Sequence, residues 1–175
     1  MIEEKLKKVI RAVPDFPKPG ILFRDITPVL QNPQLCLDVV AALLQQMNGN
    51  KVDVIAAVES RGFLFGMLLA RELKIPFVPV RKAGKLPYKT ISHSYDLEYG
   101  SATVEVHEDA ISAGSNVLIH DDLLATGGTA VAAAELMKKL GGNVAGFSFI
   151  ISLIFLEGRK TLIPYSNNII ELVKY

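Results

Sequence analysis

One segment, VLIHDDLLATGGT at residues 117–129, narrows the possible folds of this chain more than any other. Its start, Val117–His120, is an apolar run of the kind that forms a strand buried on both faces of a parallel sheet. The alanine-rich stretch Ala130–Leu140 that follows has the residues of a helix. A strand that leads directly into a helix is the repeating unit of α/β proteins, so the segment predicts a parallel sheet flanked by helices.

Gly127 and Gly128 lie between that strand and that helix, with Thr126 and Thr129 on either side. Glycine adopts backbone angles that are closed to other residues, so successive N–H groups can converge on one anion. The start of the helix adds the positive end of its dipole, and the threonine hydroxyls add further donors. The pattern predicts a phosphate cradle at the carboxyl end of the strand; an ordinary turn is the alternative for a lone glycine pair.

Asp121 and Asp122 precede the cradle, where their charges would repel a phosphate. Two carboxylates at this place are explained if they bind ribose hydroxyls or Mg²⁺, because both interact favourably with carboxylate oxygens. The segment lacks the Gly-Lys-Ser/Thr of a Walker A loop and the Gly-x-Gly-x-x-Gly of a dinucleotide-binding fold. It therefore predicts a phosphate site beside a sugar or a magnesium ion, of a different type from either of those motifs.

Strands and helices alternate along the chain, which predicts one α/β domain over residues 1–175. An antiparallel pair and an edge strand make the otherwise parallel sheet mixed at its edge. Right-handed crossovers place the loops after Val58, Val80 and His120 on one edge of the sheet. Asn32 and Ser60 are the expected N-caps of two helices. We expect helices over 3–13, 33–47, 61–73 and 129–140, and strands over 21–24, 52–58, 77–80, 95–99, 102–107, 117–120, 144–153 and 169–173.

Two further segments lie on that edge. Glu59-Ser60-Arg61 begins a helix, and a helix N-terminus with an arginine suits a pyrophosphate; an ordinary capped helix is the alternative. The segment 82–94 is long for an unstructured connection and is rich in cations, among them Lys82 and Lys85. We interpret it as a flexible loop that closes over a polyanion, rather than as a solvated charged loop.

The composition restricts partners and location. The net charge is +1 and no basic cluster dominates, which argues against nucleic-acid binding. The longest apolar run, Val144–Leu156, contains two serines and is too short to span a bilayer, so we expect no membrane association. The first residues are charged and helical in pattern, unlike a secretory leader. The single cysteine, Cys36, is expected to be an inert core thiol, and one cysteine suits a reducing cytoplasm.

The block at residues 117–129 resembles the ribose-5-phosphate motif of type I phosphoribosyltransferases. The resemblance implies that Asp121 and Asp122 hold the ribose 2- and 3-hydroxyls of phosphoribosyl pyrophosphate. It also implies that Mg²⁺, bound with that substrate, reaches the two aspartates indirectly, through the hydroxyls or water. The 5-phosphate would then lie against Ala125, Thr126, Gly127, Gly128 and Thr129.

Four other segments, 14–28, 59–63, 80–87 and 95–100, resemble adenine phosphoribosyltransferases and occur in the same order. The resemblance implies the type I phosphoribosyltransferase fold with an N-terminal hood at about residues 1–32, a flexible loop and a homodimer. Phe23 would stack on adenine, backbone groups of Leu22 and Arg24 would read its edge, and Leu123 would contact it. Pyrophosphate would contact residues from three loops: Glu59, Ser60, Arg61, Arg81, Lys82, Lys85 and Tyr99.

The implied reaction belongs to purine salvage: adenine and phosphoribosyl pyrophosphate give AMP and pyrophosphate. Arg61, Lys82 and Glu98 are the expected catalytic residues. Ala125 cannot titrate, although hypoxanthine-type relatives carry an aspartate at that place, so Glu98 is the expected proton carrier for the base. The alternatives are a phosphoribosyltransferase for another nucleobase and a non-catalytic nucleotide-sensing regulator on the same fold.

Two residues depart from the family pattern. His120 stands where a small aliphatic residue is usual, and we interpret it as a change in packing or hydrogen bonding, with tuning of Asp121 as the alternative. Ser152 stands where relatives often carry a glutamate, so the resemblance does not assign the residues at the back of the base pocket. His93, His107 and His120 do not have the spacing of metal ligands, so no structural metal is expected.

Overall fold

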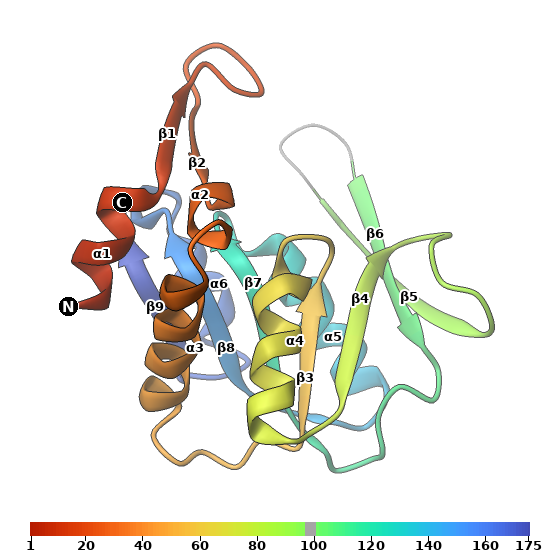
Figure 1. The fold of residues 1–175 in the computed structure, drawn as a ribbon. Helices are drawn as coiled ribbons and strands as arrows, with labels where there is room; N and C mark the ends of the chain where they lie inside the picture. The colour runs from red at the N-terminus through yellow and green to blue at the C-terminus, as the bar shows by residue number, and fades with distance from the viewer. Residues whose placement is uncertain (97–100) are drawn as a thin grey trace.

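A seven-stranded sheet forms the centre of the protein in the computed structural model, which describes residues 1–96 and 101–175 (Figure 1). The strand order is β5-β6-β4-β3-β7-β8-β9. The pairings β5–β6 and β6–β4 are antiparallel, and the pairings from β4 through β9 are parallel. This confirms the predicted parallel sheet with a mixed edge. The strands are β3 (Val54–Val58), β4 (Phe77–Lys82), β5 (Thr90–Asp96), β6 (Ser101–His107), β7 (Asn116–Leu124), β8 (Asn143–Ser152) and β9 (Ile169–Lys174).

Helices cover both faces of the sheet and give the domain two cores. One core joins alternate residues of β3, such as Ala56, to the alanine-rich face of α5. The other joins Ile55 to Val39 on α3 and Phe65 on α4. Successive residues of a strand point to opposite faces, which is why β3 is buried along its whole length. The helices are α1 (Ile2–Val9), α2 (Thr27–Leu30), α3 (Pro33–Met47), α4 (Gly62–Leu73), α5 (Gly128–Lys139) and α6 (Gly158–Leu162), with a 3₁₀ turn at Ile154–Leu156.

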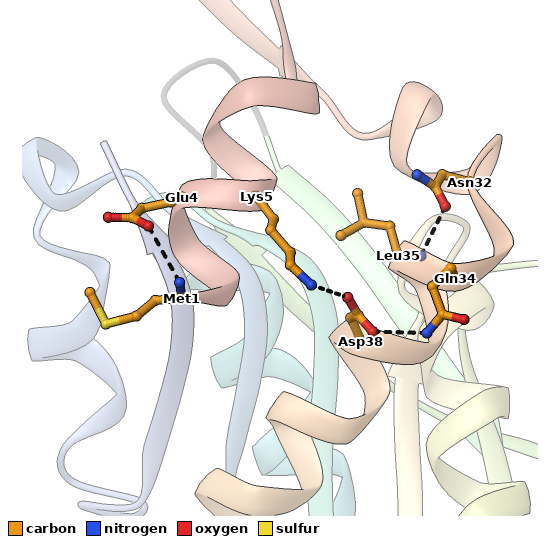
Figure 2. Close-up of polar contacts among 7 residues, drawn as sticks. All are labelled: Met1, Glu4, Lys5, Asn32, Gln34, Leu35 and Asp38. Carbon is orange, nitrogen blue, oxygen red and sulfur yellow. Dashed lines mark hydrogen bonds and ion pairs between the residues drawn. The ribbon is translucent and has the colours of Figure 1, made fainter.

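The start of α3 follows the capping rules. The Asn32 side chain accepts a hydrogen bond of 3.0 Å from the backbone N–H of Leu35, and Pro33 occupies the first helical position. Lys5 of α1 lies 2.6 Å from Asp38 of α3 and so ties the N-terminal helix to the body of the domain (Figure 2). The predicted cap and helix are confirmed.

The expected helix over 3–13 is wrong in its last turn. The helix ends at Val9, and Arg11–Pro14 forms a strand, β1, that pairs antiparallel with β2 (Leu22–Asp25). Pro14 disfavours a helical conformation at Val13, and the pairing with β2 provides backbone partners that a frayed helix end would lack. The hood is therefore a hairpin that rises from the carboxyl edge of the sheet (Figure 1).

Three other expectations need correction. The segment 82–94 is not irregular throughout, because β5 starts at Thr90 and pairs with β6 in continuous register. The strand β7 does not end at His120 but continues to Leu124. The short helices α2 and α6 were not expected, and each has too few residues to show a helical period.

Candidate active site

The predicted phosphate cradle forms a bend between β7 and α5. Residues 125–127 connect the two elements, and Gly127 has a φ of +88°, in the left-handed region that glycine adopts without strain. The bend encloses a cavity of about 70 Å³, which is wide enough for a small anionic group. The structure brings most of the predicted ribose-phosphate residues to its wall, and with them Leu123, which was predicted to contact adenine. The ribose-phosphate residues at the wall are Asp121, Ala125, Thr126, Gly127, Gly128 and Thr129.

The short helix α6 supports this bend from behind. The Thr161 hydroxyl lies 3.2 Å from the Thr126 carbonyl oxygen and 2.8 Å from the Gly158 carbonyl oxygen. A Cβ atom on Gly158 would collide with the carbonyl oxygen of Ala125 and lie 2.9 Å from the carbonyl carbon of Thr126. The bend thus has no room to move toward α6, a support that the local sequence does not reveal.

Replacing Gly158 with alanine is expected to lower the free energy of unfolding by about 1–3 kcal/mol, the usual cost of forcing an extra carbon into a packed site. Urea unfolding followed by circular dichroism measures the change. Lys160→Ala on the exposed side of the same helix is the matched control and should change the stability by less than about 0.5 kcal/mol. Equal stabilities of the Gly158→Ala and wild-type proteins would contradict the tight packing described above.

The twin carboxylates lie inside β7, close to the start of α4. Arg61 Nε is 2.7 Å from Asp122 Oδ2, and the Asp122 N–H donates a 2.8 Å hydrogen bond to Asp121 Oδ1. Burial raises the pKa of Asp121 well above its usual value, and the neighbouring charge of Asp122 raises it further. Burial also raises the pKa of Asp122, although the Arg61 guanidinium opposes that change. Such a pair favours a ligand that brings hydroxyl donors or a cation.

Glu59, at the end of β3, organises the cationic side of the edge. Its Oε2 atom accepts hydrogen bonds from Arg81 Nε at 2.8 Å and from the Lys82 backbone N–H at 3.1 Å. Lys82 and Lys85 are exposed, whereas Arg81 donates to the Lys85 carbonyl oxygen at 3.1 Å. The expectation that Ser60 caps α4 is wrong, because the N-cap residue is Arg61 and no side chain caps that helix end.

Glu105 on β6, which was not predicted as a site residue, holds the loop that follows β4. Its side chain is buried, and Oε1 accepts 3.0 Å hydrogen bonds from the backbone N–H groups of Lys85 and Leu86. Burial alone would raise the pKa of Glu105, but hydrogen bonds from the backbone of residues 84–86 outweigh it and lower the pKa. In the sequence, the signal that could have revealed this residue was a carboxylate between two strand-forming valines, Val104 and Val106.

The hood lies close to the twin carboxylates. The Phe23 ring has the Arg61 guanidinium 5.1 Å from its centroid, and Phe16 packs edge-on against it at 5.1 Å. The Arg24 guanidinium stacks 3.7 Å from the ring centroid of Tyr175, the last residue of the chain. Leu22 is exposed, and Leu123 is half-buried at the cavity wall. Phe23 of the predicted base site and Asp122 of the predicted ribose site therefore both contact Arg61.

His120 makes a buried hydrogen bond beneath the site. Its Nδ1 atom lies 2.8 Å from Ser148 Oγ on β8, and burial lowers its pKa to about 4 against a weaker effect of Ser148 that raises it. The imidazole is therefore neutral at physiological pH. The interpretation of His120 as a hydrogen-bonding change is confirmed.

Ser152 is buried at the end of β8. Its carbonyl oxygen accepts a hydrogen bond of 3.0 Å from the Tyr175 backbone N–H.

Two predicted residues, Glu98 and Tyr99, lie outside the described residues. Their flanking strands are described, and Asp96 on β5 pairs with Ser101 on β6. The expected antiparallel pair is confirmed, but its first strand is Thr90–Asp96 rather than 95–99, and Ser101 belongs to β6. Their roles in catalysis and pyrophosphate binding stay predictions.

Comparison with known proteins agrees with this geometry. Residues 27–172 match the phosphoribosyl transferase domain family. The adenine phosphoribosyltransferase of Cytophaga hutchinsonii is 49% identical over 175 residues, which cover 100% of this chain and 97% of that protein. The crystal structure of the Thermoanaerobacter pseudethanolicus adenine phosphoribosyltransferase is 50% identical, with a TM-score of 0.96 and 100% of both chains covered.

A third relative carries ligands. The Saccharomyces cerevisiae adenine phosphoribosyltransferase, solved with an imino-altritol bisphosphate and adenine, is 43% identical with a TM-score of 0.91 over 98% of both chains. Family membership is shown by the domain match, by identity near one half over the full chain and by the shared fold. The chain belongs to the phosphoribosyltransferase family, and its similar relatives are the adenine phosphoribosyltransferases.

Proposed function

We propose that this protein transfers the 5-phosphoribosyl group of phosphoribosyl pyrophosphate to adenine, giving AMP and pyrophosphate in purine salvage. The observation that carries the proposal is a chain of contacts. Asp121 lines the cavity of the bend at residues 125–129, the adjacent Asp122 pairs with Arg61, and the Arg61 guanidinium lies over the Phe23 ring. A phosphate, a ribose and a base need such a succession of surfaces in that order.

The sugar end of the substrate is held by β7 and the bend. The 5-phosphate accepts hydrogen bonds from backbone N–H groups of the bend and from the hydroxyls of Thr126 and Thr129, at the positive end of α5. The ribose 2- and 3-hydroxyls donate to Asp121 and Asp122. Because burial disfavours two bare carboxylates side by side, hydroxyl donors relieve a cost that the free site carries.

Mg²⁺ suits these residues as an indirect partner. Among residues 1–96 and 101–175, no group of three or more His, Cys, Asp or Glu side chains is placed to hold a metal. Asp121 and Asp122 nevertheless supply oxygen ligands of the kind Mg²⁺ prefers, reached through ribose hydroxyls or water, with the other ligands coming from the substrate. The ion would neutralise charge on the departing pyrophosphate.

The leaving pyrophosphate lies on the cationic side of the edge. As the bond to the anomeric carbon breaks, the sugar gains oxocarbenium character and negative charge builds on the pyrophosphate. Arg61, Lys82 and Lys85 stabilise that charge, and Arg81 is held ready by Glu59. The backbone groups of Ser60 and the Tyr99 side chain complete the pyrophosphate contacts of the proposal. Glu98 exchanges a proton with the purine ring as N9 of adenine attacks.

A base panel tests the proposed function. The purified protein is incubated with phosphoribosyl pyrophosphate, Mg²⁺ and one nucleobase at a time, and mononucleotide and pyrophosphate are measured by chromatography. Adenine should give AMP with stoichiometric pyrophosphate. Preferential turnover of xanthine, uracil or orotate would assign another nucleobase, and binding without pyrophosphate release would indicate a non-catalytic regulator.

We further propose that the active form is a homodimer in which a second copy covers the outer face of α3 and α4. Four large apolar side chains are exposed on or next to these helices: Leu30, Leu37, Leu64 and Met67. Between the helices runs a groove whose lining includes Leu37, Leu44 and Leu68. A large apolar surface that is exposed on one chain commonly marks a protein–protein interface.

Substitution of Met67 by glutamate is expected to turn a dimer into a monomer, since it places a charge on that apolar face. Sedimentation velocity at micromolar concentration measures the mass. Lys51→Glu, an exposed change outside α3 and α4, is the control and should leave the dimer intact. A wild-type protein that sediments as a monomer would contradict the proposal.

The cytoplasm is the proposed location. Within the part of the chain that the structure describes, no helix has the length and apolar character to cross a membrane. Cys36 is half-buried, its thiol donates to the Val29 carbonyl oxygen at 3.4 Å, and burial raises its pKa. A thiol of this kind has low reactivity, as expected of the inert residue inferred from the sequence.

A further inference from the structure

A tyrosine from β5 reaches the start of α5. The Tyr95 hydroxyl lies 3.0 Å from Thr129 Oγ1, and the two residues are far apart in sequence. The Tyr95 ring also packs on the bend itself, because a Cβ atom on Gly128 would lie 3.3 Å from Tyr95 Cδ2. Both contacts fall on residues that form the wall of the phosphate cavity.

The rest of β5 is fixed to the same helix. Lys139, at the other end of α5, donates to the Ser92 carbonyl oxygen at 3.1 Å and lies 3.3 Å from His93 Nδ1. Tyr95 is half-buried and packs against the core that contains α5. The position of the Tyr95 hydroxyl is therefore set by contacts at both ends of the helix.

We propose that Tyr95 is a positioning residue for the reaction: its hydroxyl donates to Thr129 Oγ1 and so directs the Thr129 proton at the 5-phosphate. The inference rests on the proposed function, which places that phosphate in the cavity. Phosphate oxygens at this site act as acceptors, so Thr129 must donate to them. Both lone pairs of its hydroxyl oxygen stay available, and Tyr95 is placed to donate to one of them.

Without this partner, the Thr129 hydroxyl has an alternative. Rotation about the Cβ–Oγ1 bond can turn the hydroxyl hydrogen toward another acceptor, which withdraws the proton from a ligand. A donor on the other side of the oxygen opposes that rotation. Two hydrogen bonds in series also polarise each other, which strengthens the bond to the phosphate.

Steady-state kinetics of Tyr95→Phe test the inference, because this change removes the hydroxyl and keeps the ring against Gly128. The KM for phosphoribosyl pyrophosphate, and the KM for AMP in the reverse reaction, should each rise about 3- to 10-fold, the usual worth of one hydrogen bond. The KM values for adenine and pyrophosphate, which do not carry the 5-phosphate, should stay within about twofold, as should kcat. A merely structural role would move all four KM values.

The matched control is Tyr165→Phe. Tyr165 also reaches α5 through its hydroxyl, which donates to Glu135 at 2.6 Å, but it lies away from the cavity. This variant should leave all four KM values unchanged. Thermal unfolding of both variants shows whether either has lost stability.

A double-mutant cycle adds a second measurement. In a Thr129→Val background, Tyr95→Phe should have no further effect on the KM for AMP, whereas in a Thr129→Ser background, which keeps a hydroxyl, the effect should persist. Additive effects in the valine background would overturn the inference.

Wild-type kinetics are measured first. A wild-type protein that forms no AMP would overturn the proposed function and this inference together. Normal wild-type kinetics, combined with unchanged KM values for AMP and phosphoribosyl pyrophosphate in Tyr95→Phe, would overturn the inference alone.

Discussion

Hypoxanthine should be converted with a kcat/KM about 10⁴–10⁵-fold below that of adenine, the discrimination reached by sites that hydrogen-bond the correct substrate. The adenine amino group donates a hydrogen bond and N1 accepts one, whereas hypoxanthine presents an acceptor and a donor at these positions. With hypoxanthine bound, a backbone carbonyl that suits the adenine amino group would face an acceptor, and a backbone N–H that suits N1 would face a donor. Each buried group left unpaired carries a desolvation penalty.

The hood supplies backbone groups of this kind. The strand β2 pairs with β1 on one side, so alternate residues of β2 direct their N–H and C=O groups away from β1. Leu22 and Arg24 are two residues apart and therefore present their groups on the same side. Arg24 stacks on Tyr175, which follows β9 and bonds to Ser152 at the end of β8. This contact fixes β2 next to the ends of those two strands.

Mononucleotide formation from each base, at equal enzyme concentration, measures the ratio. Unsubstituted purine, which lacks the amino group but keeps N1 as an acceptor, is the matched control and should fall between adenine and hypoxanthine. Turnover of hypoxanthine within tenfold of adenine would contradict base reading by the hood backbone.

A second large effect is expected for Glu98→Gln, which should lower kcat by about 10²–10⁴-fold, the usual contribution of general acid–base catalysis. Formation of the bond at N9 requires that the purine ring lose a proton. Ala125 cannot accept one, and Glu59 and Glu105 are already engaged with backbone N–H groups. Glu98 lies outside the described residues and follows β5 in the sequence.

Presteady-state and steady-state rates of AMP formation measure this loss. Glu108→Gln is the control, because Glu108 is exposed and its ion pair with Lys89 is 3.8 Å long, so kcat should stay within about twofold. An unchanged kcat in Glu98→Gln would remove Glu98 from the proton-transfer role.

Local patterns were sufficient for the sheet and the phosphate bend. A buried strand, two acids, a glycine pair and a helix follow one another within residues 117–139, so each part of that site is a neighbour of the next in sequence. The capping of α3 by Asn32 was predictable for the same reason, because the cap and the helix are adjacent in sequence. Physical rules that act over a few residues are enough to interpret such segments.

Supports that come from distant segments were not predictable in this way. Thr161 and Gly158 back the bend from α6, Glu105 holds the loop after β4, and Tyr95 reaches Thr129 from β5. Each contact depends on which strands become neighbours, and local sequence does not contain that information. The end of α1 is a mixed case: Pro14 is a local signal against helix at Val13, whereas the pairing of β1 with β2 is decided by the tertiary structure.

The central claim is that the bend at residues 125–129 binds the 5-phosphate through main-chain amides. A crystal structure of the protein with AMP tests it most directly. We predict the phosphate in the cavity between β7 and α5, with its oxygens about 2.7–3.2 Å from backbone nitrogens of the bend and from Thr129 Oγ1. AMP bound elsewhere, with this cavity empty and the amides of the bend directed away from it, would contradict the account.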